Sequence, residues 1–288
     1  MLKIGHKDGK RYLYTEAGEN ITRLRAFGEV AGSLRSNAFV VASGPSVADF
    51  PMEKYREHPY IAMNGSILAC QKNGVKPYFY ICDDESFARD RAEIALQGVR
   101  TASHIGMSLE VLSRLYAVDR SCLNGASVFL LERANRYFGQ PRLSDRAFAW
   151  SIRKDPELLS RFSLFSQSLN RIGFSKNLDK GYFVGRTIPY VALQLCHQLG
   201  CSRIFLVGVD MDQEKGRFYE KGAAAVPSGL DKSYKKIILP SFRFMRDAVI
   251  KKNTFEVYNL SLGSRIPDDV VKKLGLRGLE RLLSGERA

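Results

Sequence analysis

Polar residues follow several short apolar runs in this chain, and the first such group has the chemistry of a nucleotide site. The run that begins near Asn37 ends in Ser43-Gly44-Pro45-Ser46. Gly44 lets the backbone approach a phosphate or ribose closely, and Pro45 fixes the turn. Ser46 offers a hydroxyl and a backbone N–H where a helix begins, a position at which anions bind. A Gly-Pro pair is also a common bend, so this stretch alone leaves both interpretations open.

Carboxylates follow two further apolar runs. Asp83 and Asp84 end one of them, and Asp210 ends another. The aspartate pair could bind a divalent metal ion, a ribose or a base edge, or it could cap a loop. Asp210 could orient a ligand or cap a turn. The same position, at the end of an apolar run, is occupied by Asn64, Gly208, Asn259 and Ser261.

Several well-known motifs are absent from the sequence. It contains neither GxGxxG nor GxxxxGK[ST], which argues against dinucleotide-binding Rossmann enzymes and P-loop NTPases. The five cysteines are scattered without CxxC or zinc spacing, so we expect free thiols in a reducing compartment. Of the four histidines, only His104 lies near a predicted strand end, and no Ser/His/Asp constellation can be assembled.

The elements that must position these side chains alternate along the chain. We expect strands at 38–43, 60–67, 77–86, 99–104, 202–212 and 254–261, and helices at 87–98, 187–200 and 239–252. Such alternation predicts a Rossmann-like α/β fold, with a mostly parallel sheet flanked by helices. In open sheets of this kind ligands bind at the carboxyl ends of the strands, where the polar residues above would converge. We therefore expect these residues to form one nucleotide site.

The length of 288 residues fits one large domain. We expect a lead-in with a short strand pair at 1–30, followed by a single α/β nucleotide-binding domain at 31–288. The region of about 108–180 interrupts the strand pattern, and we predict a helical insertion or lid there. Its two predicted helical stretches are SVFLLERANRYF (127–138) and LLSRFSLFSQSLNRI (158–172).

The charge is strongly positive, with a formal net value of +14. Residues 151–288 hold 24 Lys and Arg against 14 Asp and Glu, so most of the excess lies there. Such a field attracts polyanions in general. No apolar stretch reaches the roughly 18 residues of a membrane span, and no secretory signal is evident. We expect a cytoplasmic protein that could contact the inner membrane peripherally, where 268–287 could lie on anionic lipid or pack as an ordinary terminal helix.

Four blocks, in order, carry a family resemblance: VVASGPSV, IAMNGSI, TIPYVALQLCHQLGCSRIFLVGVDMD and EVYNLSLGS. Together they resemble the bacterial lipooligosaccharide sialyltransferases. They also resemble a related set, the motility accessory factors and the 6-hydroxymethylpterin diphosphokinase-like proteins. The resemblance implies a variant glycosyltransferase-A type of Rossmann-like fold with an insertion.

The resemblance also implies roles for individual residues. Tyr219 matches one of two tyrosines that stabilise the leaving phosphate in the sialyltransferases, and Arg186 and Arg217 could assist. The family's general-base histidine has no counterpart, because no histidine follows His197. Asp83, Asp84 or Asp231 could replace it. The positions that match the family's donor contacts are Gly44, Pro45, Ser46, Asn64, Thr187, Gly208 and Asp210, and Thr187 alone is kept from a Thr-Ser-Gly segment.

The activity implied is transfer of an acidic sugar, sialic acid or a Kdo-like sugar, from a CMP-sugar donor to a lipopolysaccharide or other cell-surface glycan. No metal ion or other cofactor is implied, and the partners would be the donor and the glycan or glycolipid acceptor. The basic C-terminal half could also contact an anionic membrane surface. An oligomer is left open.

Two alternatives remain open at this point. One is a pyrophosphokinase-like transferase that uses ATP and Mg²⁺, with Asp83 and Asp84 as metal ligands. The other is a non-enzymatic basic protein that binds nucleic acid. The sequence contains no recognised RNA-binding motif, so we expect no nucleic-acid partner.

Overall fold

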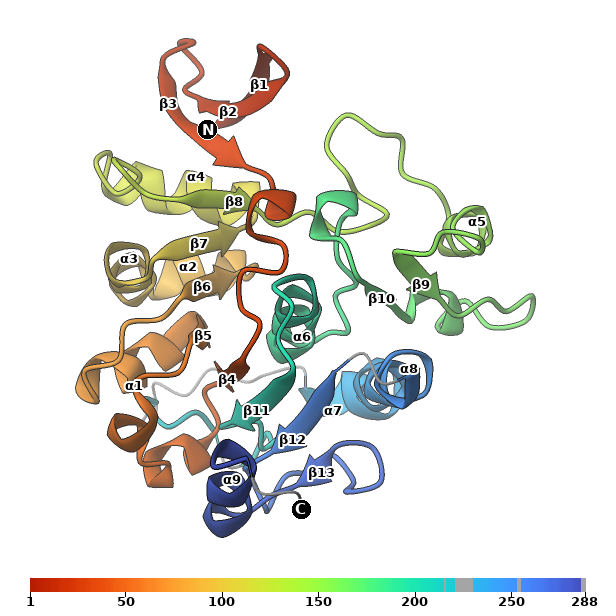
Figure 1. Cartoon of the computed structure of the whole chain (residues 1–288). Coiled ribbons are helices and arrows are strands. Elements are labelled where there is room, and N and C mark those ends of the chain that lie inside the picture. Colours follow the sequence, from red (N-terminus) through yellow and green to blue (C-terminus); the bar gives the residue numbers. More distant parts are fainter. Residues whose placement is uncertain (215, 221–229, 253–254, 286–288) are drawn as a thin grey trace.

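The computed structural model describes residues 1–214, 216–220, 230–252 and 255–285. Within this part of the chain, one large sheet has the strand order β1-β2-β3-β8-β7-β6-β5-β4-β11-β12-β13 (Figure 1). All neighbours from β3 to β13 are parallel, and β1, β2 and β3 pair antiparallel. The strands are β1 (Lys3–Lys7), β2 (Lys10–Tyr14), β3 (Asn20–Arg25), β4 (Asn37–Val41), β5 (Tyr60–Met63), β6 (Phe79–Cys82), β7 (His104–Met107), β8 (Val128–Leu130), β11 (Arg203–Val207), β12 (Glu256–Asn259) and β13 (Lys272–Lys273).

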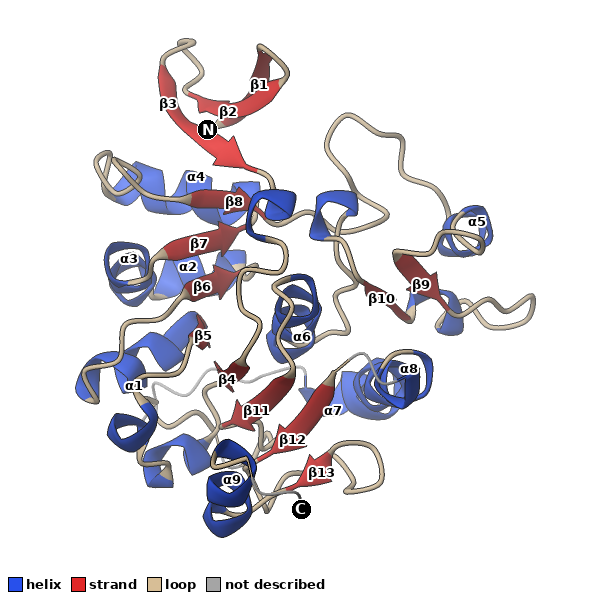
Figure 2. Ribbon diagram, viewed as in Figure 1, coloured by secondary structure: helices blue, strands red, loops and turns tan. Residues whose placement is uncertain are grey.

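Helices cover both faces of this sheet (Figure 2). In β4, Phe39 and Val41 face one core and Ala38 and Val40 face the other, which is why the strand reads as a continuous apolar run. One core, which contains Phe39, is covered by α1 (Ile67–Lys72), α2 (Glu85–Asp90), α3 (Ala92–Thr101), α4 (Leu109–Val118) and α9 (Leu276–Leu283). The other core, which contains Ala38, is covered by α6 (Ile188–Gln198) and α8 (Leu239–Ala248). The predicted fold class, a mostly parallel sheet flanked by helices, is confirmed.

The strand order reverses direction between β4 and β11. The chain builds outward from β4 through β5, β6 and β7 to β8, and then returns along α6 to place β11 on the other side of β4. In open α/β sheets, the crevice outside the carboxyl ends of two such strands is the usual ligand site. This switch point brings the end of β4, near Gly44, next to the end of β11, near Gly208.

Parts of the predicted element pattern were wrong. Residues 99–101 belong to α3, and the strand that was expected at 99–104 begins only at His104. Residues 127–138 do not form a helix, because Val128–Leu130 are buried on both faces as β8 of the main sheet. The expected last strand began at Thr254, which lies outside the described residues, and β12 covers Glu256–Asn259.

The segment 134–181, which we call the arm, leaves the sheet after β8 and returns before α6. A parallel bridge between Arg133 and Tyr182 closes its base. The stretch 158–172 was predicted as helix, but it contains β9 (Leu158–Ser160), which pairs antiparallel with β10 (Gly173–Ser175). Serine side chains compete with helical hydrogen bonding there, since the Ser163 hydroxyl accepts from the Ser166 N–H at 3.0 Å. The arm's α-helix is α5 (Asp145–Ser151).

The terminal segment packs on the body of the protein. Leu279 and Leu282 of α9 are buried in the same core as Phe39, so the apolar face of this helix is covered by the body of the protein. The alternative of an ordinary packed terminal helix therefore holds for α9, whereas 268–275 is not helical and contains β13, and Glu286 and Arg287 lie outside the described residues.

Gln194 of α6 holds the end of the arm against the body. Its buried Oε1 accepts hydrogen bonds from the backbone N–H groups of Ser175 and Phe183, both at 2.9 Å, and its Nε2 donates to the Phe183 carbonyl at 2.8 Å. Gln194→Leu keeps the volume but leaves these backbone groups unpaired. We expect the free energy of unfolding to fall by about 3–5 kcal/mol in urea titrations.

The matched control is Gln71→Leu on α1, where the amide of the exposed Gln71 donates to the Thr101 hydroxyl at 3.2 Å. We expect a change below about 1 kcal/mol for this variant. Equal unfolding midpoints for the Gln194 variant and the wild type would contradict the anchoring role of this side chain.

Candidate active site

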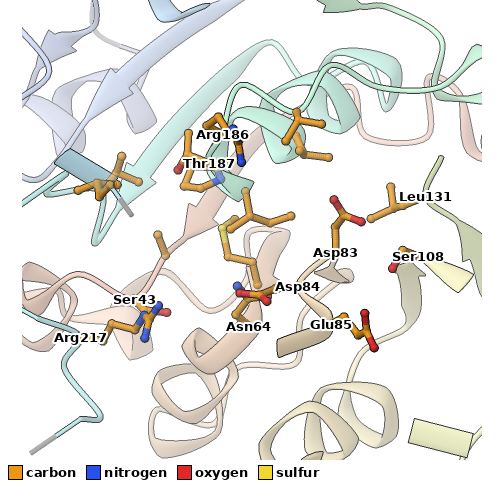
Figure 3. Close-up of a pocket in the computed structure, with 18 of the residues that line it drawn as sticks. Ser43, Asn64, Asp83, Asp84, Glu85, Ser108, Leu131, Arg186, Thr187 and Arg217 are labelled. Atoms are coloured by element: carbon orange, nitrogen blue, oxygen red, sulfur yellow. The ribbon is translucent and has the colours of Figure 1, made fainter. Parts of the chain in front are cut away.

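A cleft of about 1010 Å³ lies at the carboxyl ends of β4, β5, β6 and β11, beside the first residues of α6 (Figure 3). Seven of the predicted site residues line it, namely Gly44, Asn64, Asp83, Asp84, Thr187, Gly208 and Asp210. The other five, Pro45, Ser46, Tyr219, Asn259 and Ser261, are not among its lining residues. The cleft coincides with the switch point of the sheet.

The ends of β4 and β11 lie so close together that position 44 must be a glycine. Its N–H donates to the Gly208 carbonyl at 2.8 Å. A Cβ at position 44 would lie 2.1 Å from Oδ2 of Asp210 and 2.5 Å from that same carbonyl oxygen. Gly208 itself has a φ of 72°, which favours glycine. The two glycines therefore fix the shape of the cleft floor.

A hydrogen-bond network lies directly behind this floor. The Ser46 hydroxyl donates to Asp210 at 2.8 Å and lies 2.7 Å from the hydroxyl of Ser261. The Ser261 N–H donates to the side-chain oxygen of Asn259 at 3.0 Å, and its hydroxyl accepts from the N–H of Val209 at 3.1 Å. This network joins the ends of β4, β11 and β12, so these residues hold the lining in place.

Asn64 has an unused polar atom at the cleft. Its backbone carbonyl accepts from the Tyr80 hydroxyl at 2.9 Å, while its side-chain Oδ1 is buried and has no hydrogen-bond partner among the described residues. Its φ of 44° is a strained value that asparagine tolerates better than most residues. An unpaired buried acceptor and a strained backbone are typical of a ligand-binding position.

Asp83 forms an ion pair with Arg133, which lies at the base of the arm. A guanidinium nitrogen of Arg133 donates to its carboxylate at 3.0 Å. Burial raises the pKa of Asp83, and Arg133 opposes this shift. The Tyr182 hydroxyl lies close enough to affect both groups, but its geometry is not that of a hydrogen bond. A carboxylate with a raised pKa in a cleft is a candidate general base.

Asp84 has a different environment from that of Asp83. It is exposed and caps α2, since its side chain accepts from the Phe87 N–H at 3.1 Å. Among the residues that the structure describes, no three His, Cys, Asp or Glu side chains gather closely enough to hold a metal ion.

Three further arginines line the cleft, namely Arg136, Arg186 and Arg217, and the last two were predicted from the sequence. Arg217 pairs with Glu220 at 2.6 Å. Arg186 is exposed with a φ of 59° and directly precedes Thr187, whose hydroxyl makes no capping bond to α6. Burial and the nearby Arg142 and Arg133 lower the pKa of Arg136. An arginine held among other cations at a cleft wall is suited to bind an anion.

Arg133 and Arg136 were missed because 127–138 was predicted as a helix. A strand that ended at Leu130 would have placed them at a strand tip, with the other site residues. The signal was present in the buried, aromatic Val-Phe-Leu run.

Tyr219 lies next to the cleft rather than on its surface. Its ring fills the space over Gly65, where a Cβ would come within 2.0 Å of it, and burial raises the pKa of its hydroxyl. Asp231, the third candidate base, forms an ion pair with Arg265 and is not a lining residue.

Neither of the histidines considered above lines the cleft. His104 begins β7 at the amino edge of the sheet and contacts Ser127 at 2.9 Å. His197 packs between Phe174 and Phe255, and burial lowers its pKa to about 4.

A comparison with protein families decides what kind of protein this is. The family model described as 3-deoxy-D-manno-octulosonic acid transferase WaaZ matches residues 28–275. The chain belongs to this family. The predicted glycosyltransferase activity is thereby confirmed, and since 3-deoxy-D-manno-octulosonic acid (Kdo) carries a carboxyl group, so is the transfer of an acidic sugar.

Two curated relatives agree with this family. A protein of Salmonella typhimurium named "Probable 3-deoxy-manno-octulosonic acid transferase" is 27% identical over 257 residues, covering 87% of this chain and 91% of that protein. A protein of the same name from Escherichia coli is 27% identical over 255 residues, covering 87% and 86%.

Two solved structures show a partial similarity to this chain. The MAf glycosyltransferase of Magnetospirillum magneticum AMB-1 matches this chain with a TM-score of 0.46 and 17% identity. The match covers 84% of this chain and 34% of the MAf glycosyltransferase. The WaaZ-family chain thus spans about a third of that protein. The sialyltransferase CstII of Campylobacter jejuni, in complex with cytidine-5'-monophosphate, has a TM-score of 0.41 and 14% identity, covering 83% and 85%.

In the described part of this WaaZ-family transferase, no helix has both the length and the apolar character needed to cross a bilayer.

Proposed function

We propose that this enzyme transfers Kdo from a CMP-activated donor to a lipopolysaccharide or other cell-surface glycan. The observation that carries the proposal is the cleft at the switch point of the sheet, with the unpaired Oδ1 of Asn64 on one wall and a set of arginines around it. The family and the names of its relatives support Kdo over sialic acid as the sugar.

The donor nucleotide would lie between β4, β5 and α6. The carboxamide of Asn64 would bind the base or ribose of CMP, and the glycine floor at Gly44 and Gly208 would accommodate the ribose. The N-terminus of α6, at Thr187, and the adjacent Arg186 would receive the phosphate, since the positive end of a helix dipole and a guanidinium both favour an anion.

The sugar would extend toward the arm. Its carboxylate would bind Arg136, whose surroundings already favour an anionic partner. The anomeric carbon would then lie near Asp83. The acceptor hydroxyl attacks this carbon, the bond from the carbon to the CMP phosphate oxygen breaks, and Asp83 takes the hydroxyl proton.

CMP leaves as an anion, and Arg186, Arg217 and the Tyr219 hydroxyl would stabilise its phosphate. Asp84 would support the site by fixing the start of α2.

In this proposal the reaction needs no metal ion, because arginines supply the positive charge. The acceptor would be reached from the cytoplasmic side of the inner membrane. The buried, free state of all five cysteines is compatible with a reducing compartment.

A thermal-shift panel with CMP, CDP, UDP, GDP and ATP, each with and without Mg²⁺, tests the donor class. We expect CMP to raise the melting temperature without Mg²⁺, because a ligand that binds the folded state stabilises it. Stabilisation by ATP with Mg²⁺ alone would overturn the proposal and favour the pyrophosphokinase-like alternative.

Asn64→Gly tests the nucleotide wall. Glycine accepts the positive φ at this position, so the substitution removes only the carboxamide. We expect the Kd for CMP, measured by calorimetry, to rise about 5- to 30-fold, which corresponds to one hydrogen bond to the nucleotide, while the unfolding midpoint stays equal or rises. Asn124→Gly, at an exposed asparagine, is the control and should leave the Kd unchanged. An unaltered Kd in Asn64→Gly would place the nucleotide elsewhere.

A further inference from the structure

Exposed apolar side chains gather on the arm. Of the ten large apolar residues that are exposed in the described structure, six belong to it. Single exposed apolar residues are normal on a protein surface, but a cluster marks an interaction site. The arm projects from the side of the sheet, with the β9–β10 loop farthest out (Figure 1). The six residues are Phe138, Leu143, Trp150, Phe162, Leu164 and Phe165, of which Phe138 also lines the cleft.

Three of these side chains, Phe162, Leu164 and Phe165, belong to the β9–β10 loop. Asn170, which is only 1% exposed, accepts from the Ser163 N–H at 2.8 Å and donates to the Ser163 carbonyl at 2.9 Å. This clamp fixes the loop while Leu164 remains 59% exposed and Phe165 97% exposed. A loop with a fixed backbone and apolar residues at its tip is ordered before it meets any partner.

Trp150 of α5 joins this tip. Its ring packs against Phe162, with ring centroids 5.1 Å apart, and the Arg153 guanidinium lies 3.9 Å from the centre of the indole. Lys154 and Arg161 lie close by in the sequence, on either side of β9. The surface therefore combines aromatic and aliphatic side chains with a border of cations. We call Trp150, Phe162, Leu164, Phe165 and these three cations the arm tip.

The positive charge of the arm tip is not neutralised by the arm's own carboxylates. The arm contains nine Lys and Arg against four Asp and Glu. Asp145 pairs with Arg171 at 2.6 Å, and Asp155 and Glu157 both pair with Lys180 at 2.8 Å. These carboxylates thus pair with Arg171 and Lys180 and not with Arg153, Lys154 or Arg161, whose charges are left for a partner. Aromatic side chains with adjacent cations are the chemistry of insertion into an anionic lipid surface.

We propose that the arm tip docks this enzyme on an anionic lipid bilayer. Phe162, Leu164 and Phe165 enter the interface with the indole of Trp150 at headgroup level, and Arg153, Lys154 and Arg161 contact lipid phosphates. The arm begins after Arg133, a residue of the cleft, so docking brings the cleft to the surface on which a lipid-borne acceptor is carried. The membrane contact is thereby assigned to the arm rather than to α9, whose apolar face is buried.

A second copy of this chain fits the arm tip less well. Two arm tips that meet about a two-fold axis would bring their cations together, and the formal net charge of +14 opposes self-association in general. An anionic bilayer provides both the apolar phase and the countercharge.

The test uses the full chain and lipid vesicles. Trp150 is the only tryptophan in the sequence, so its fluorescence reports on the arm tip alone. We expect a blue shift of its emission and co-sedimentation of the protein with vesicles of phosphatidylcholine and phosphatidylglycerol, but neither effect with phosphatidylcholine alone. Binding should weaken as salt is added. No blue shift with the anionic vesicles overturns the proposal.

Two double variants and one matched control separate the contributions. Leu164→Ser with Phe165→Ser, and Lys154→Glu with Arg161→Glu, should each reduce vesicle affinity about 10-fold or more. The control is Leu262→Ser with Leu276→Ser, two exposed leucines outside the arm, and its affinity should equal that of the wild type. Equal loss in the control contradicts the assignment to the arm.

Two further measurements distinguish lipid docking from misfolding and from self-association. Stabilisation by CMP should persist in the arm-tip variants, which shows that the fold and the donor site are intact independently of lipid binding. If the molar mass in light scattering falls to that of a monomer in Leu164→Ser with Phe165→Ser, and the wild type does not bind vesicles, the arm tip is an interface between copies and the proposal is wrong.

Discussion

Gly44→Ala is expected to lower the free energy of unfolding by about 3 kcal/mol and to abolish stabilisation by CMP. The added Cβ would lie 2.1 Å from the Asp210 carboxylate and 2.5 Å from the Gly208 carbonyl. The carboxylate could rotate away only by losing its hydrogen bonds to Ser46. The carbonyl is backbone at the end of β11, so it cannot move without shifting that strand.

The loss of nucleotide binding has the same origin as the loss of stability. The ends of β4 and β11 form the cleft floor, and their spacing is fixed by the 2.8 Å hydrogen bond between Gly44 and Gly208. Separating the two ends to admit a methyl group displaces the surface on which the nucleotide would lie. Urea titration measures the first effect, and the thermal shift with CMP measures the second.

Gly275→Ala provides the control for this substitution. Gly275 has a negative φ of −81° and nothing within 4 Å of an added Cβ. Because it occupies the N-cap of α9, where alanine is slightly worse than glycine, we expect a loss of a few tenths of a kcal/mol at most. Similar stability losses in the two variants would show that the contact between Gly44 and Asp210 is not what constrains position 44.

The location of the site could be predicted from the sequence because the core strands are parallel and buried on both faces. Such strands appear as short continuous apolar runs, and the polar residue after each run must lie at one edge of the sheet. Asn64, Asp83 and Gly208 were found in this way. The strand order was not predictable from periodicity, and so the switch point between β4 and β11 emerged only from the structure.

The division of labour within the site also required coordinates. Ser46, Asn259 and Ser261 follow apolar runs like the lining residues do, yet their hydrogen bonds are directed to each other and to Asp210. Sequence position gives the edge of the sheet on which a side chain lies, but not the direction in which the chain turns after the strand. The same limit applies to Asp83 and Asp84, which are adjacent in sequence but differ in burial and in partner.

The segment from β8 to the end of the arm was the least predictable part of the chain. The stretches 127–138 and 158–172 contain residues compatible with helices, but they lack a complete apolar stripe at helical spacing. Their conformation depends on contacts that are distant in sequence or specific to a loop, such as the pairing of β8 with β7 and the clamp from Asn170 to Ser163. The exposed aromatic residues that sequence periodicity would assign to a buried face belong instead to the arm tip.

Asp83→Asn is expected to lower the kcat for sugar transfer by about 10²- to 10⁴-fold, the usual contribution of a general base. The substitution keeps the shape of the side chain and an oxygen for Arg133, but it removes the group that would accept the proton of the acceptor hydroxyl. Release of CMP from CMP-Kdo, in the presence of a lipopolysaccharide-type acceptor, measures this rate. The Kd for CMP should change little, because the proposed nucleotide contacts lie at Asn64 and α6.

The pH dependence of kcat provides a second test of the role of Asp83. A base must be deprotonated to act, so the wild-type kcat should rise with pH as Asp83 loses its proton. Because burial raises the pKa of Asp83 above its ordinary value, against the opposing effect of Arg133, this limb should lie at higher pH than that of an exposed aspartate. The limb should be absent from Asp83→Asn. A limb that persists in the variant would assign the base to another group.

As the pH rises, the ionisation of Asp83 should lower the stability of the fold while it raises the activity. A carboxyl group whose pKa is higher in the folded than in the unfolded protein makes the fold less stable as the pH rises through those values, because folding then opposes its ionisation. A neutral amide at position 83 therefore should not lower the unfolding midpoint at neutral pH, even though the ion pair with Arg133 is lost. Asp84→Asn, which retains a capping oxygen for α2, should keep both activity and stability. Loss of activity in Asp83→Asn without loss of stability would thus separate a proton acceptor in the cleft from a residue that only supports the fold.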